Sequence, residues 1–224
     1  HLLSIFILLS NSLDLVTKKH LLEETDSSQA VLSELVKKGI LEIFDYEVSR
    51  FNYGETDMDA AYKLNPYQLD AYNQILSSFK EKDVTLLHGV TSSGKTEVYI
   101  QLIKEVIKRG EQVLYLLPEI ALTTQITNRL KAVFGNKLAV YHSKFNDNER
   151  AETWNRLLKD SEAQVILGAR SAVFLPFKRL GLIIVDEEHE GSYKQQDPAP
   201  RYNARNAAIF LANMLKAKIL LGTA

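Results

Sequence analysis

The sequence predicts an α/β protein whose main domain holds a mostly parallel, doubly wound sheet, preceded by a small helix-and-strand module. Three observations lead to this prediction. From residue 64 onward, short apolar runs alternate with amphipathic segments of helical periodicity. A glycine-rich phosphate loop follows the first of these runs. Residues 1–60 lack the alternation, so we expect one module over residues 1–60 and one domain over residues 61–224.

Six apolar runs in the larger domain are the expected strands. Because the runs are uniformly apolar, they are typical of strands buried on both faces of a parallel sheet, with helices on each side. Amphipathic helices are expected between most of them, for example over residues 96–109 and 123–134. The expected strands are residues 84–88, 112–117, 137–141, 163–168, 180–186 and 217–222.

The first 60 residues predict one capped helix and one strand. The helix begins after Asp26 or Ser27 as N-cap and ends at Gly39 in a left-handed conformation. Residues 40–51 alternate apolar and polar side chains, as a half-buried strand does. Helix, turn and strand in this order form a winged helix, but they also form many other small α+β modules. The apolar face of the helix comprises Val31, Leu32, Leu35 and Val36.

Composition narrows the class of protein. The chain is 46% hydrophobic and 25% charged, as in a soluble globular protein. Its net charge of −1 gives no global field toward polyanions, so any nucleic-acid contact needs a local basic patch. It contains no cysteine, which excludes disulfides and thiolate zinc sites. The apolar run at residues 5–9 is far shorter than the roughly 20 residues that span a bilayer, so we expect no membrane association. The absence of cysteine is compatible with a reducing compartment such as the cytoplasm.

The segment GVTSSGKT matches the phosphate-loop pattern G-x-x-x-x-G-K-[ST]. Its glycines allow backbone angles that turn successive N–H groups toward a β-phosphate. Lys95 would reach the β- and γ-phosphates, and the Thr96 hydroxyl would bind Mg²⁺. The loop follows an expected strand and opens an expected helix, which is the context that the motif requires; the alternative is a glycine turn with a surface lysine. The predicted nucleotide-binding residues of this loop are Gly89, Thr91, Ser92, Ser93, Gly94, Lys95 and Thr96.

A second acidic motif, DEEH, follows the buried strand at residues 180–186. We expect Asp186 to hold Mg²⁺ through water and Glu187 to polarise an attacking water, as in ATPases. Together with Lys95 these are the predicted catalytic residues. The alternative is a solvated acidic turn, although such turns rarely follow six apolar residues directly.

Gln68 lies upstream of the phosphate loop and could read the adenine edge through its amide, with Tyr67 or Tyr72 stacking nearby. A solvated glutamine on a helix face is the alternative. Spacing alone does not separate ATP from GTP. However, guanine-binding folds usually carry Asn-Lys-x-Asp, and here Asn136-Lys137 is followed by Leu138 and Ala139.

Six segments occur in the order and approximate spacing of one helicase family. They are HGVTSSGKTEVY, LLPEIALTTQ, YHS, GARSAVFLPF, DEEHEGSYKQ and PRYNAR. The sequence therefore resembles the PriA family of bacterial replication-restart DNA helicases, which belong to superfamily two. The resemblance covers residues 64–224 and implies the first RecA-like helicase domain, with ATP and Mg²⁺ as cofactors. Residues 1–60 then correspond to part of the winged-helix module that precedes this core in the family.

The resemblance also implies roles for particular residues. Gln68 matches the adenine-reading glutamine of the family. The segments PEIALT and GARSA match those that grip the backbone of single-stranded DNA, which implies phosphate contacts for Thr123, Arg170 and Ser171. For Arg170, a salt bridge within a loop is the alternative. Gly222 and Thr223 match the motif that couples the nucleotide and DNA sites.

In this family, the loop after the acidic motif is an aromatic-rich sensor of single-stranded DNA. The resemblance therefore implies that Tyr193 and Tyr202 stack on bases, a contact worth ~1–3 kcal/mol for each base. His189 would relay between this loop and the nucleotide. Asn203 and Asn206 depart from the histidine and aspartate of the family pattern, which lowers the charge of the loop. The residues implied to neutralise DNA phosphates are Lys194, Arg201 and Arg205.

The resemblance implies a parent protein that is an ATP-driven 3′-to-5′ helicase of replication restart and primosome assembly. Its implied partners are single-stranded and forked DNA, primosome proteins and single-strand-binding proteins, at the bacterial nucleoid. The second RecA-like domain with its arginine finger, the cysteine-bound zinc module and the terminal DNA-binding domains have no counterpart here. The sequence is therefore expected to be a piece of the parent, weakly active or inactive alone, and to need no zinc itself.

Two other function classes fit part of the pattern. A P-loop kinase or metabolic ATPase would need a small-molecule pocket and lid arginines, and DNA would not change its rate. A DNA- or protein-binding module would keep the nucleotide site for a structural purpose only. The acidic motif together with the stacking loop argues against both.

Overall fold

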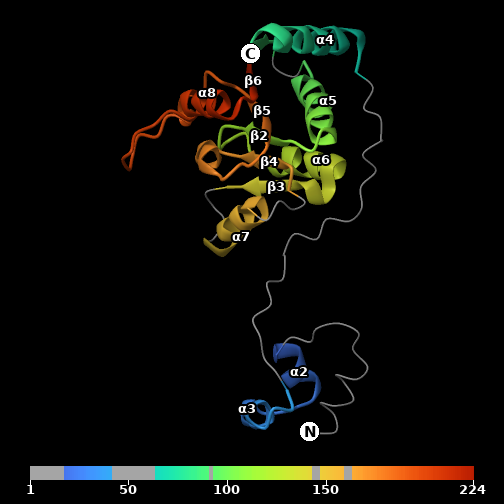
Figure 1. Cartoon of the computed structure of the whole chain (residues 1–224), viewed down its shortest axis with the longest axis vertical. Coiled ribbons are helices and arrows are strands. Elements are labelled where there is room, and N and C mark those ends of the chain that lie inside the picture. The colour runs from blue at the N-terminus through green and yellow to red at the C-terminus, as the bar shows by residue number, and fades with distance from the viewer. Residues whose placement is uncertain (1–17, 42–63, 91–92, 143–146, 159–162) are drawn as a thin grey trace. The chain divides into compact units, whose positions relative to one another are not determined.

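The computed structural model describes residues 18–41, 64–90, 93–142, 147–158 and 163–224. The chain divides into two compact units, His1–Val48 and Ser49–Ala224 (Figure 1). The boundary expected near residue 60 lies outside the described residues. Within the described residues, no helix is both long enough and apolar enough to cross a bilayer.

The larger unit is built on one six-stranded sheet in which every strand pairing is parallel. The strand order is β1-β6-β5-β2-β4-β3. This confirms the predicted sheet, and each expected strand begins and ends within two residues of the observed one. The strands are β1 (Val84–His88), β2 (Gln112–Leu116), β3 (Leu138–Tyr141), β4 (Val165–Gly168), β5 (Leu180–Val185) and β6 (Lys218–Thr223).

Helices cover both faces of this sheet, so the doubly wound arrangement is also confirmed. One core cluster joins the sheet to three helices through Ile75, Leu102 and Leu130, and the other joins it to two helices through Leu157 and Ala208. On the first face lie α4 (Pro66–Glu81), α5 (Lys95–Lys108) and α6 (Thr124–Phe134). On the second face lie α7 (Asp147–Leu158) and α8 (Ala204–Leu215). Three short 3₁₀ turns are η1 (Gly135–Lys137), η2 (Arg170–Phe174) and η3 (Gly191–Tyr193).

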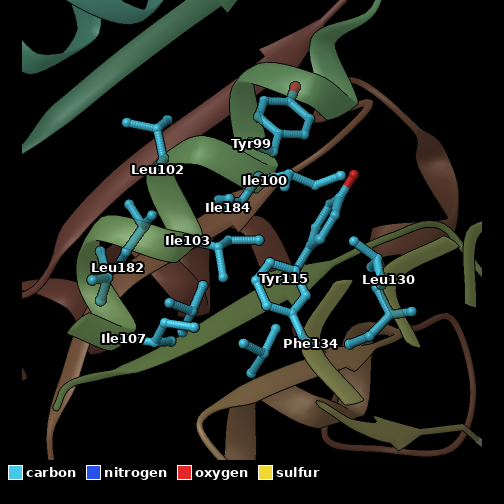
Figure 2. Packing of buried hydrophobic residues seen from close by; sticks show 14 of the residues in the cluster. Tyr99, Ile100, Leu102, Ile103, Ile107, Tyr115, Leu130, Phe134, Leu182 and Ile184 are labelled. Carbon is cyan, nitrogen blue, oxygen red and sulfur yellow. The ribbon is translucent and has the colours of Figure 1, made fainter. Parts of the chain in front are cut away.

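The first core cluster contains two tyrosines among its aliphatic side chains (Figure 2). Tyr99 of α5 and Tyr115 of β2 are both fully buried. Their ring centroids are 5.6 Å apart and the rings meet edge to face. A buried tyrosine hydroxyl usually finds a polar partner, so these two rings point to a polar group within this core.

Strand β1 is an exception to the expectation that all strands are buried on both faces. Val84 is 44% exposed and Leu86 is 58% exposed. The reason is topological: β1 is an edge strand, and the described helix that packs on it covers one face only. That face carries Thr85, whose hydroxyl lies 2.8 Å from that of Ser78 in α4.

The smaller unit contains α2 (Lys18–Glu24) and α3 (Gln29–Lys37), whose shared core comprises Leu21, Leu32 and Leu35. The predicted N-cap was wrong, because Ser28 precedes the helix and its side chain makes no capping bond. Asp26 instead forms the turn between the helices with a φ of 46°. Gly39 does adopt the predicted left-handed conformation, with a φ of 68°. The strand expected over residues 40–51 lies almost wholly outside the described residues.

Candidate nucleotide and DNA site

The predicted site residues follow the carboxyl ends of neighbouring parallel strands. This is the edge of an open α/β sheet where ligands bind. The phosphate loop follows β1, the acidic motif follows β5, and β6 lies between them. The N–H of Gly89 donates to the carbonyl of Thr223 at 3.1 Å, and the N–H of Glu188 donates to the carbonyl of Gly222 at 2.8 Å. The end of β6 therefore ties the two motifs together.

The lysine of the phosphate loop lies close to three oxygen atoms. Gly94 adopts a φ of 82° directly before α5, as a left-handed glycine should. The Nζ of Lys95 donates to the carbonyl oxygens of Gly89 at 2.8 Å and Thr223 at 3.3 Å, and it lies 3.7 Å from a carboxylate oxygen of Glu187. An anion can therefore replace weak neutral acceptors at this ammonium group. Thr96 is half-buried in the first turn of α5, while Thr91 and Ser92 lie outside the described residues.

Gln68 contacts the phosphate loop directly. Its Nε2 donates to the carbonyl of Gly94 at 3.4 Å, and its Oε1 accepts from the N–H of Asn65 at 2.9 Å. The second bond belongs to a capping box that begins α4. One amide hydrogen and one lone pair remain for an adenine edge, so the adenine role stays a prediction. Tyr67 is 88% exposed and available for stacking, whereas Tyr72 packs against the core.

Asp186 directly follows β5 and is only 9% exposed. Its Oδ1 accepts from the hydroxyl of Tyr99 at 3.0 Å and from the N–H of Glu187 at 3.1 Å, and its Oδ2 accepts from the hydroxyl of Tyr115 at 3.1 Å. Burial raises the pKa of the Asp186 carboxyl, and the hydrogen bonds from the tyrosines counteract that rise. Burial together with the nearby Asp186 raises the pKa of both tyrosines, so their hydroxyls stay protonated and donate.

Glu187 occupies a backbone conformation that is rare for a residue with a side chain. Its φ is 48°, in the left-handed region. This conformation turns its N–H back to Asp186 and leaves its carboxylate 30% exposed beside Lys95. Non-glycine residues in such conformations cluster at functional sites. The position suits the predicted role of polarising a water molecule.

His189 connects the acidic motif to the end of β6. Its Nδ1 lies 2.9 Å from the hydroxyl of Thr223, and its Nε2 lies 3.9 Å from a carboxylate oxygen of Glu187. Gly222 contributes through its lack of a side chain, because a Cβ there would overlap the Tyr99 hydroxyl. These contacts bring together the three residues predicted to couple the sites, and the coupling itself stays a prediction.

The prediction that Tyr193 stacks on bases is wrong for this conformation. Its ring is 1% exposed and belongs to the second core cluster. Its hydroxyl donates to the main-chain carbonyl of Asp186 at 2.6 Å and lies 3.1 Å from that of Leu116. The buried ring therefore fixes the loop to the acidic motif. The side chains packed around it leave no space for a base to stack on it.

The other aromatic residue of this loop lies in a different environment. Tyr202 is half-buried and meets the 57%-exposed ring of Phe174 edge to face, with centroids 4.8 Å apart. Lys194 and Arg201 are exposed, and Lys194 pairs with Asn203 across the base of the loop. Asn203 also caps α8 by accepting from the N–H of Asn206 at 3.2 Å. The loop therefore presents cations beside an aromatic pair.

Three of the predicted phosphate-binding side chains already have protein partners. Arg205 forms an ion pair with Glu188 at 2.7 Å. The Nη1 of Arg170 donates to the carbonyl of Ser192 at 3.3 Å, which differs from the salt bridge considered as an alternative. The hydroxyl of Thr123 accepts from the N–H of Ile126 at 3.4 Å as the N-cap of α6. Ser171 is half-buried in η2. Binding of DNA phosphates would have to compete with the first two contacts.

Four residues at this site were missed by sequence reasoning: Tyr99, Tyr115, Phe174 and Glu188. A signal existed for the two tyrosines, because each lies between two aliphatic residues, and a buried hydroxyl there had to find a partner. For Phe174 and Glu188 no local signal existed, since their contacts join segments far apart in sequence.

The residues present suit a magnesium ion better than a more demanding metal. Among the described residues, no group of three or more His, Cys, Asp or Glu side chains could hold a metal ion. Mg²⁺ keeps several water molecules and uses one or two carboxylates together with substrate phosphates. The carboxylate of Asp186 and the hydroxyl of Thr96 supply that kind of oxygen ligand.

Two family models match the chain. The DEAD/DEAH box helicase model matches residues 65–224, and the model for the winged helix domain of PriA helicase from Bacteroidota matches residues 1–48. Among solved structures, the helicase MrfA and RecG bound to a three-way DNA junction each give a TM-score of 0.52 over 88% of this chain. They cover 29% and 23% of those chains, at 16% and 20% identity, and show the fold alone.

Curated relatives are similar at much higher identity. The chain is 42% identical over 205 residues to the replication restart protein PriA of Synechocystis sp., and 41% identical over 212 residues to that of Bacillus subtilis. Each alignment covers 91% of this chain but only 24% and 26% of the relative, so the chain spans about a quarter of their length. The resemblance to the PriA family is confirmed, and the chain belongs to the DEAD/DEAH box helicases.

Proposed function

We propose that this chain is the first nucleotide-binding motor domain of an ATP-dependent 3′-to-5′ DNA helicase that acts in replication restart and primosome assembly. The observation that carries the proposal is the meeting of Lys95, Asp186 and Glu187 at one sheet edge, next to a loop with exposed cations and an aromatic pair. The names of the curated relatives support the pathway, and the family supports the use of ATP.

The nucleotide side of the proposal assigns a task to each residue. Lys95 exchanges its carbonyl partners for the β- and γ-phosphates, to which it makes charge-assisted hydrogen bonds. Thr96 and Asp186 would hold Mg²⁺, which would supply positive charge to neutralise the phosphates. Glu187 orients a water molecule beside them. Turnover is expected to be slow without a second domain, because an arginine finger is worth ~10³–10⁵ in rate.

The DNA side of the proposal places single-stranded or forked DNA against the loop after the acidic motif. Tyr202 stacks on a base, and Lys194, Arg201 and Arg170 bind phosphates, with Thr123 and Ser171 on the neighbouring segments. A phosphate that takes Arg205 releases Glu188, which directly follows Glu187. DNA binding thereby changes the charges around the hydrolytic carboxylate. Primosome and single-strand-binding proteins in the bacterial cytoplasm are the proposed protein partners.

Two titrations of the 224-residue chain test this function. Fluorescent ADP with Mg²⁺ should bind, and excess ATP should displace it better than GTP does. A fluorescein-labelled fork with single-stranded arms should bind and should be released by added salt, since phosphate contacts release counterions. A chain that binds neither ligand, or that prefers GTP, would contradict the proposal.

Replacing Tyr202 with alanine is expected to weaken binding of a labelled oligothymidine about 5- to 150-fold, because one stacked base is worth ~1–3 kcal/mol. Fluorescence anisotropy at constant salt measures the effect. Tyr67→Ala is the matched control, since it removes another exposed ring that lies in α4 beside the phosphate loop. Equal losses in the two variants would show that the loop has no special role.

A further inference from the structure

Three tyrosines from three separate elements converge on Asp186. Tyr99 comes from the first turns of α5, Tyr115 from β2 and Tyr193 from η3. Two of them donate to the carboxylate, one to each oxygen, and the third donates to the main-chain carbonyl of the same residue. All three rings are buried, with exposures of 0%, 0% and 1%. Figure 2 shows Tyr99 and Tyr115 side by side in a cluster whose other labelled side chains are aliphatic except for Phe134.

The hydrogen bonds fix the orientation of the carboxylate. A carboxylate oxygen has about two lone-pair sites. Oδ1 uses both, on the Tyr99 hydroxyl and the Glu187 N–H, whereas Oδ2 uses one, on the Tyr115 hydroxyl. Among the described donors, nothing takes the remaining site on Oδ2. Rotation of the carboxylate would break bonds on both oxygens at once.

The arrangement is more specific than burial of two tyrosines requires. Phenylalanine at either position would fill the same apolar space without needing a polar partner. Both hydroxyls instead use one carboxylate, and Gly222 leaves the space that the Tyr99 hydroxyl occupies. A Cβ at Gly222 would also lie 3.0 Å from Oδ1 of Asp186. Four separate segments thus accommodate this one group.

We propose that Tyr99 and Tyr115 are positioning residues that hold the Asp186 carboxylate with one lone-pair site of Oδ2 free for a water molecule of Mg²⁺. Tyr193 supports the same residue through its main chain. The inference rests on the proposed function, because it concerns magnesium binding at the nucleotide site. Neither Tyr99 nor Tyr115 touches the nucleotide in this scheme; each acts through Asp186.

The test compares nucleotide affinity with and without magnesium. Fluorescent ADP is titrated into the wild-type chain, Tyr99→Phe, Tyr115→Phe and the double variant, once in excess Mg²⁺ and once in EDTA. In EDTA all four should bind alike, because the phosphate loop is unchanged. The affinity gain from Mg²⁺ should fall about 10-fold in each single variant, since loss of a partner of a metal ligand typically costs 10–100-fold in metal affinity.

Tyr141→Phe is the matched control, because its ring is 8% exposed and its hydroxyl contacts Arg150 rather than Asp186. It should keep the full magnesium gain. The inference would be overturned if Mg²⁺ raised the ADP affinity of the double variant as much as that of the wild type. It would also be overturned if Mg²⁺ did not change the ADP affinity of the wild type. Absence of ADP binding in both conditions would instead refute the proposed function. A variant that does not fold is recognised because it does not bind ADP in EDTA. The magnesium dependence of the other single variant then tests the inference.

Discussion

Replacing Lys95 with alanine is expected to weaken binding of Mg·ADP about 100-fold, because hydrogen bonds to charged groups contribute ~1.5–3 kcal/mol each. The ammonium group donates to the carbonyl oxygens of Gly89 and Thr223, and the Lys95 side chain is 10% exposed. A phosphate that replaces these neutral carbonyl acceptors would form a stronger, charge-assisted hydrogen bond. A titration with fluorescent ADP gives the ratio of the two dissociation constants.

Lys108→Ala controls for the loss of a positive charge from the same helix. Lys108 lies in the last turn of α5, is exposed, and pairs only loosely with Glu105 at 3.7 Å. Its removal should leave the affinity for ADP unchanged. If Lys95→Ala bound ADP as the wild type does, the phosphate loop would not be the nucleotide site. The unfolding transition of each variant shows whether the larger unit remains folded.

Much of the fold followed from the sequence because its strongest signals are local. The six strands are apolar runs of four to six residues, bounded by helices with clear periodicity, and all six appear in the sheet. The phosphate loop and the acidic motif could be assigned because each combines a strand end with a fixed residue pattern. Their proximity follows from the parallel sheet, since parallel strands end at the same edge.

What sequence reasoning missed depends on contacts between distant segments. Nothing near β1 shows that it is an edge strand with Val84 and Leu86 exposed, because that depends on the order of strands in the sheet. The position of Tyr193 in an aromatic, polar loop favoured an exposed ring. Its hydroxyl instead reaches a main-chain carbonyl seven residues earlier, so the loop is anchored below Asp186.

The pairing of Arg205 with Glu188 was also missed because it joins two segments that are apart in the sequence. An arginine in a loop with exposed cations is a reasonable candidate for a DNA phosphate, and the sequence contains no sign of its acidic partner 17 residues earlier. The pair holds the loop against the acidic motif. Arg205 would therefore have to leave Glu188 to bind a DNA phosphate.

Replacing Gly222 with alanine is expected to lower the free energy of unfolding by about 1–3 kcal/mol, the usual cost of an extra carbon in a packed core. The new Cβ would overlap the Tyr99 hydroxyl, within a strand that is paired on both sides. Urea unfolding followed by tryptophan fluorescence measures the change. The chain has one tryptophan, Trp154 in α7, so the signal reports the larger unit alone.

A double variant identifies the cause of this loss. Tyr99→Phe removes the overlapping oxygen, and the next ring atom, Cζ, lies 3.2 Å from the ideal Cβ. The double variant Tyr99→Phe/Gly222→Ala should therefore lose less free energy of unfolding than the sum of the two single variants, although Asp186 loses one hydrogen bond. Gly191→Ala is the control, because no atom lies within 4 Å of a Cβ there, and it should combine additively with Tyr99→Phe. Additive losses for Gly222 as well would mean that the strand relaxes away from the hydroxyl, and that the glycine does not serve the tyrosine–aspartate contact.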